Sequence, residues 1–273
     1  MLKKLFKHDF NSVFKYWWIA AISSFALSLI AGVCLSWLTH DRDLPIFFTS
    51  SIYRIFGLAL LGLVVVAILS FVLVNVRFYK NLFTDEGYLT FTLPVKRSDL
   101  LNSKLLLGVT FSVLTTWLLA ADILIMLSLP YPDTVAKFFE SLWELFYYPT
   151  LTDALYSIAY ILEFILIGLL SSLLSTQFLY ACITVTSLIT KKARVLITIG
   201  IYYSVGSITT FVTQMFFTFG IPSITRWLVA VPTNLHNITV VLIMLGIIAF
   251  LVIASTLLYV FEYWLLDRKL NLS

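Results

Sequence analysis

The chain has 273 residues, of which 60% are hydrophobic and only 12% are charged, and its net charge is +4. A soluble domain carries about 25% charged residues, so this composition excludes a water-soluble globule and predicts a chain whose solvent is lipid. Helices satisfy their backbone hydrogen bonds without water, which favours an all-α membrane protein. The two cysteines, Cys34 and Cys182, lie in apolar runs and indicate neither a disulfide nor a metal site.

The N-terminal segment 1–14 places apolar residues three or four positions apart, with Lys3, Lys4 and Lys7 between them. This spacing predicts an amphipathic helix that lies on the inner leaflet of the membrane. The alternative is a basic flank of the first membrane span.

Six apolar runs follow, and each exceeds the roughly 20 residues that a helix needs to cross the hydrocarbon. They lie at about 17–38, 52–76, 105–128, 154–189, 195–219 and 237–261. No polar stretch between them is long enough to bury a core of its own. We therefore expect residues 1–273 to form a single transmembrane domain of six helices.

Lysine and arginine residues set the orientation of these spans. If the N-terminus lies inside, 14 of the 18 basic residues fall on the inner side. They are Lys3, Lys4, Lys7, Lys15, Arg77, Lys80, Lys96, Arg97, Lys104, Lys191, Lys192, Arg194, Arg268 and Lys269. Because inner loops carry the excess of positive charge, both termini are predicted in the cytoplasm of a multi-pass plasma-membrane protein.

The outer connection 129–153 contains a second amphipathic segment, at 133–148. It mixes acidic residues with Phe138, Phe139 and Trp143, and aromatic residues favour the headgroup level of a bilayer. A helix that lies on the outer membrane surface is expected there.

The inner connection 77–104 combines charged residues with several aromatic ones before it enters the third span. A cytoplasmic connection of this composition is predicted to contact a partner, and the alternative is a solvated connector. The candidate contact residues are Tyr79, Leu82, Phe83, Asp85, Glu86, Tyr88 and Pro94.

The same connection carries a pattern that resembles a known family. It has an acidic residue in a short helix, an apolar-Leu-Pro-Val turn, a basic pair and a Leu-Leu-x-x-Lys sequence at the start of a span. The residues are Glu86, Leu93, Pro94, Val95, Lys96, Arg97, Leu100, Leu101 and Lys104. This pattern, with six spans and an amphipathic N-terminus, resembles type-2 ATP-binding-cassette (ABC) exporter permeases of Gram-positive bacteria.

The resemblance implies that separate subunits carry out transport and ATP hydrolysis. In that family the connection holds a coupling helix that docks on a separate cytoplasmic ATPase, and a re-entrant hairpin precedes the last span, where 220–237 lies here. The implied partners are ABC ATPase subunits, a second permease that is identical or related, and membrane lipid, with no nucleic acid. ATP and magnesium would bind to the ATPase, so no cofactor is expected in this chain.

Catalytic motifs are missing from the sequence. No G-x-x-x-x-G-K-[ST] segment is present to bind the phosphates of ATP, and His8, His40 and His236 are scattered along the chain. We therefore expect a permease and not an enzyme. The expected function is export of an amphipathic or hydrophobic substrate, such as an antimicrobial peptide, and the alternative is a stand-alone channel or secondary transporter.

The fifth run carries Tyr203, Ser207, Thr210 and Gln214 at spacings of three and four, which places them on one helical face. Such a face predicts either a helix–helix seam or one wall of a translocation path.

Three charged residues lie within or beside apolar runs: Arg54, Asp122 and Glu163. Asp122 follows Lys104 by about 27 Å of helix, which predicts a position at the outer boundary. Two hypotheses remain open for them, namely ordinary boundary charges with an Arg54–Asp122 pair, or an acidic outer vestibule for a cationic substrate.

Overall fold

The computed structural model describes residues 2–40, 45–83, 97–144, 150–189, 194–215 and 235–268, and the single positions 146, 218, 220, 226 and 232. All regular secondary structure in these ranges is helical, which confirms the predicted all-α class. Five of the described helices are long and apolar enough to cross a membrane. The protein is therefore a multi-pass membrane protein by the length and composition of its helices.

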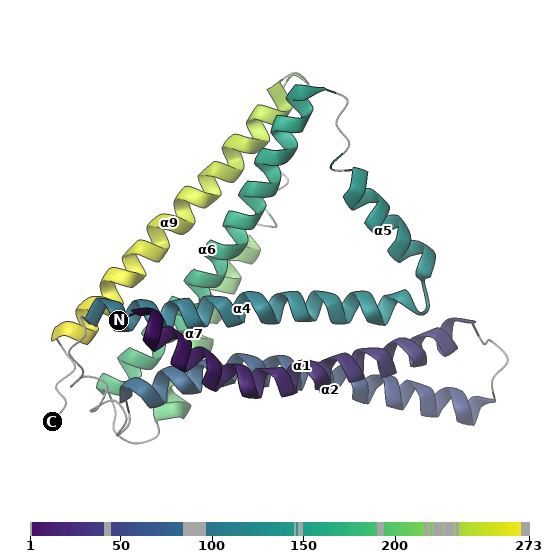
Figure 1. Ribbon diagram of the computed structural model, residues 1–273, viewed down its shortest axis with the longest axis horizontal. Coiled ribbons are helices and arrows are strands. Elements are labelled where there is room, and N and C mark those ends of the chain that lie inside the picture. The colour runs from purple at the N-terminus through teal and green to yellow at the C-terminus, as the bar shows by residue number, and fades with distance from the viewer. Residues whose placement is uncertain are drawn as a thin grey trace. The chain divides into compact units, whose positions relative to one another are not determined.

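The helices correspond to the predicted apolar runs. They are α1 (Leu2–His40), α2 (Ile46–Phe83), α4 (Arg97–Ser128), α5 (Pro132–Glu144), α6 (Leu151–Ile189), α7 (Arg194–Met215) and α9 (His236–Arg268) (Figure 1). The apolar part of α7, Val195–Phe211, is shorter than the other five. The chain divides into two compact units, one of 1–82 with 102–148 and the other of 83–101 with 149–273.

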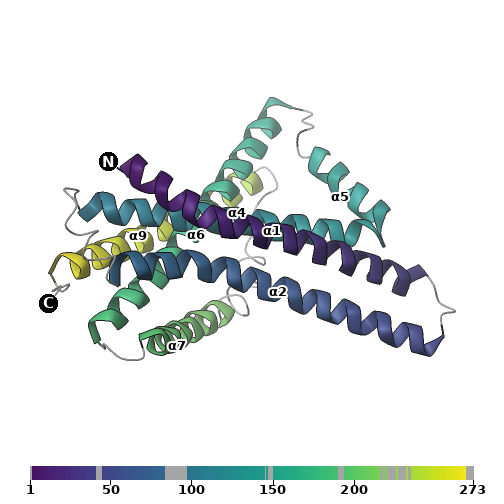
Figure 2. The same cartoon turned by 60° about the horizontal axis from the view of Figure 1, so that its bottom comes forward.

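In the first unit, α1 and α2 lie side by side and antiparallel (Figures 1 and 2). A Cβ atom at Gly62 of α2 would lie 2.9 Å from Leu27 of α1, whereas Val74 of α2 packs near Val13. Residue numbers thus rise in one helix as they fall in the other, as in a helical hairpin.

The helix α4 runs parallel to α1 in the same unit. The indole Nε1 of Trp17 donates a 3.1 Å hydrogen bond to the hydroxyl of Thr115. Further along both helices, a Cβ atom at Gly32 would lie 3.1 Å from the carbonyl oxygen of Met126. The backbones of α1 and α4 therefore approach closely at Gly32, where the absence of a side chain permits it.

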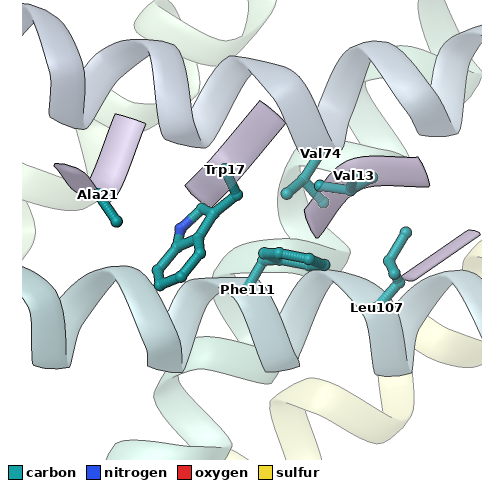
Figure 3. Packing of buried hydrophobic residues seen from close by; sticks show 6 residues of the cluster. All are labelled: Val13, Trp17, Ala21, Val74, Leu107 and Phe111. Atoms are coloured by element: carbon teal, nitrogen blue, oxygen red, sulfur yellow. The ribbon is translucent and has the colours of Figure 1, made fainter. Parts of the chain in front are cut away.

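A buried apolar cluster joins these three helices (Figure 3). Its members are Val13, Trp17, Ala21, Val74, Leu107 and Phe111. The rings of Trp17 and Phe111 meet edge to face with centroids 6.1 Å apart. Segment 1–14 is the first part of the continuous helix α1, and its residues Phe10 and Val13 pack against α2 and α4. Its expected position on the inner leaflet stays a prediction.

In the second unit, α6 and α9 pack along each other in the same direction (Figure 1). The hydroxyl of Tyr160 donates to the carbonyl oxygen of Asn237 at 3.2 Å, and that of Ser255 donates to Gln177 Oε1 at 2.8 Å. The residue numbers therefore rise in the same direction along α6 and α9, so the two helices are parallel. The helix α7 contacts α6, and the rings of Phe178 and Tyr202 lie 5.6 Å apart.

The predicted outer amphipathic segment is helical over α5. None of its residues is buried, and its apolar side chains Phe138, Phe139 and Trp143 are exposed. Such a helix is stable only where another apolar medium covers its apolar face, which keeps the expectation of a surface-bound helix open.

Candidate functional site

A buried carboxylate joins the three helices of the first unit beyond the apolar cluster. The Asp9 side chain of α1 is 5% exposed. It forms a 3.3 Å ion pair with Arg77 and accepts a 3.1 Å hydrogen bond from Asn81, and both residues lie on α2. Lys104 Nζ of α4 donates to the other carboxylate oxygen, and the lysine side chain is itself only 4% exposed. We name Asp9, Arg77, Asn81 and Lys104 the Asp9 clamp.

The charges of the Asp9 clamp are compatible with its burial. An isolated buried charge is unfavourable, but here one carboxylate shares its two oxygens between two cations and an amide. Arg77 is 22% exposed and connects the group to solvent. The clamp therefore fixes the relative position of the three helix ends by charge-assisted hydrogen bonds.

The location of the Asp9 clamp links it to the predicted contact segment. Arg77 and Asn81 lie near the C-terminal end of α2, and Lys104 lies in the second turn of α4, so they flank the connection 84–96. The clamp therefore joins α1 to the two helix ends that flank residues 84–96.

Three of the seven predicted contact residues lie in the described ranges. Tyr79 is half-buried, Leu82 is buried, and Phe83 is the last residue of α2. The burial of Leu82 makes it a packing residue in this structure. The remaining four residues lie outside the described ranges: Asp85, Glu86, Tyr88 and Pro94.

A second polar group lies deeper in the first unit. Asp122 of α4 is 2% exposed and lies beside Ser24 and Ser28 of α1, which are also buried. Both serine hydroxyls donate to carbonyl oxygens of their own helix, Ser24 to Ala21 at 3.0 Å and Ser28 to Phe25 at 2.8 Å. Among the described residues, neither carboxyl oxygen of Asp122 has a hydrogen-bond partner.

The helix contacts give the position of Asp122 along α1. Lys104 pairs with Asp9, which precedes Lys15 by about 9 Å of helix. The serines that flank Asp122 lie about 14 and 20 Å beyond Lys15 along α1. The expected position of Asp122 at the outer boundary of the membrane stays a prediction.

The other two charged residues of that set lie elsewhere. Arg54 of α2 is exposed, so it does not accompany the buried Asp122. Glu163 of α6 is 6% exposed and belongs to the second unit. The outer vestibule of Arg54, Asp122 and Glu163 therefore stays a prediction, whereas the Arg54–Asp122 pair is absent from the described contacts of Asp122.

The polar face of α7 is exposed within the chain. Tyr203, Ser207, Thr210 and Gln214 all lie on exposed positions, whereas Tyr202 faces Phe178 of α6. Within the described ranges, these four side chains are not covered by another helix. The choice between a seam and a path stays open.

Sequence reasoning missed two buried acids, Asp9 and Glu262. Asp9 follows Leu5 and precedes Val13 by four residues each, so it interrupts an apolar helical stripe and was identifiable from its spacing. Glu262 of α9 is 1% exposed and follows Ser255 by two helical turns, on the face that contacts α6. Neither carboxyl oxygen of Glu262 has a hydrogen-bond partner in the described structure.

No group of three or more histidine, cysteine or acidic residues suited to a metal ion occurs in the described ranges. Neither a protein-family model nor a curated protein nor a solved structure matches this chain.

Proposed function

We propose that this chain is the membrane-spanning permease subunit of an ATP-driven exporter. Two such subunits, identical or related, would enclose a path, and separate cytoplasmic ATPases would bind ATP and drive alternating access. The substrate would be amphipathic or hydrophobic, with a peptide as the first choice by analogy with the family that the connection 77–104 resembles.

The Asp9 clamp is the observation that carries this proposal. An ATPase that acts on a permease needs a cytoplasmic contact and a rigid connection from that contact to the transmembrane helices. The clamp connects both stems of the candidate contact segment with α1 through one carboxylate. A solvated connector would need no such link between three helices.

Six crossings with both termini inside are part of the proposal. Parallel packing of α6 and α9 requires an odd number of crossings between them, and α7 is the described helix in that interval. Antiparallel α1 and α2, followed by α4 parallel to α1, fit the same alternation. The exposed polar face of α7 would then face the second permease or the path.

Replacement of two aromatic residues of the contact segment tests the exporter proposal. Phe83→Ala with Tyr88→Ala should abolish substrate-stimulated ATPase activity and transport and reduce co-purification of the ATPase. Each large apolar side chain contributes about 1.5–3 kcal/mol when buried, so docking should weaken by one to several orders of magnitude.

The matched control removes one tyrosine and one phenylalanine on the predicted outer side of the membrane. Tyr131→Ala with Phe139→Ala changes exposed residues at and near α5 and should leave ATPase coupling intact. Full coupled activity of the Phe83 and Tyr88 double variant would contradict the proposal, provided that the variant reaches the membrane in normal amount.

A proton-coupled secondary transporter is the second candidate function, and the burial of Asp122 in α4 favours it. Such transporters carry ionisable residues inside their membrane-spanning helices. Proteoliposomes that contain this chain alone, with an entrapped pH-sensitive dye, distinguish the two. Proton flux on addition of an amphipathic peptide supports the secondary transporter, whereas transport only with an ATPase and ATP supports the exporter.

A further inference from the structure

The Asp122 carboxyl group lies in surroundings that do not stabilise a negative charge. It is 2% exposed, and its oxygens accept no hydrogen bond from the described residues. An ionised carboxylate without a partner is strongly unfavourable in an apolar interior. Lipid outside the helices would not relieve this cost, because it supplies no hydrogen-bond donors.

Two serine hydroxyls of α1 lie beside the Asp122 carboxyl group. Those of Ser24 and Ser28 donate to the carbonyl oxygens of Ala21 and Phe25, at 3.0 and 2.8 Å. Each hydroxyl has one hydrogen, so a serine that keeps its bond to a carbonyl oxygen can accept the O–H of a protonated carboxyl group but cannot donate to an ionised one at the same time.

No charged side chain from the neighbouring helices compensates Asp122. The segment of α1 between Lys15 and His40 contains no charged residue, and Cys34 is its one thiol. The segment of α2 between Arg54 and Arg77 contains no titratable residue. These two segments therefore supply no cation that could pair with Asp122.

We propose that Asp122, Ser24 and Ser28 form an intramembrane site that binds a single proton. The proton is held on the carboxyl group and shared with a serine oxygen. A metal cation needs a shell of several oxygen ligands. In the described ranges, no group of three or more histidine, cysteine or acidic residues suited to a metal ion occurs here. The site is independent of whether ATP or an ion gradient drives transport.

Infrared difference spectroscopy of the purified protein in lipid tests the site. The wild-type protein should show the carbonyl stretch of a protonated carboxylic acid at neutral pH, and Asp122→Asn should lose this component. Ser24→Ala with Ser28→Ala should retain the band and shift it to higher frequency, because the hydrogen bond to the serine oxygen is lost.

Two other buried acids provide controls for the assignment of the band. Glu163→Gln and Glu262→Gln should leave the Asp122 component in place. Identical spectra of the wild type and Asp122→Asn would overturn the proposal, as would replacement of the band when NaCl or KCl is added at constant pH, which would indicate a metal cation. If Asp122→Asn fails to fold, an unshifted band in the double serine variant overturns it instead.

Discussion

Asp9 holds three helices with one carboxylate, so its removal should destabilise the protein more than removal of either cation. Asp9→Ala withdraws the shared partner of Arg77 and Lys104, and loss of one member of a buried ion pair costs about 3–5 kcal/mol. Lys104→Met should cost less, because Arg77 and Asn81 still contact the carboxylate. Thermal unfolding of the detergent-solubilised variants measures both.

Glu140→Ala serves as the control, since Glu140 lies on an exposed position in α5 and should change stability little. Equal losses for Asp9→Ala and Glu140→Ala would mean that the Asp9 clamp contributes nothing to stability. The double variant Asp9→Ala with Lys104→Met should recover part of the loss, because it removes both charges together.

The contacts of single polar residues were the feature of this molecule that was least predictable from the sequence. Composition indicates which side chains meet lipid, but not which polar residues meet one another across helices. Asp9 and Lys104 are 95 positions apart, and only the packing of α1 on α4 brings them together.

Among the helices, the contact between α1 and α4 depends on one glycine. Gly32→Ala would place a methyl group 3.1 Å from a carbonyl oxygen and 3.3 Å from the Cα atom of Met126. Backbone atoms move only with the whole helix, so we expect a loss of about 1–3 kcal/mol in unfolding experiments. Gly57→Ala is the matched control, because no atom lies within 4 Å of the added group. Equal stability of both variants would contradict the close packing.

The amphipathic helix α5 should bind the outer membrane surface with its aromatic face. In a variant without Cys34 and Cys182, an environment-sensitive fluorophore on Leu142→Cys should shift to shorter wavelength in lipid vesicles. The same label on Glu140→Cys, on the opposite face of α5, should keep the longer emission wavelength of a fluorophore in water. Equal emission at both positions would show that α5 does not lie on the membrane.

For the whole molecule, the proposed orientation predicts which positions an impermeant thiol reagent reaches in intact cells. Lys137→Cys on α5 should react from outside, whereas Ser273→Cys should react only after the membrane is permeabilised. Labelling of Ser273→Cys from outside would reverse the orientation that the basic residues indicate.

The helical architecture was predictable from hydropathy because lipid demands long apolar helices. Five of the six predicted runs lie within a described helix, and the fifth, 195–219, extends past the end of α7 at Met215. Partner choice among helices was not predictable, since lipid-facing and helix-facing residues are equally apolar. The parallel pairing of α6 with α9 is specified by a few polar contacts, such as Gln177 with Ser255.

The Asp9 clamp also imposes an order on biosynthesis. Arg77 and Asn81 follow Asp9 by 68 and 72 positions, whereas Lys104 follows it by 95. A nascent chain emerges from its N-terminus, so the hairpin of α1 and α2 can neutralise Asp9 before α4 has been translated. Lys104 contacts Asp9 once α4 has been translated. A ribosome that stalls before α4 therefore leaves α1 and α2 paired through Asp9 without their contact to α4.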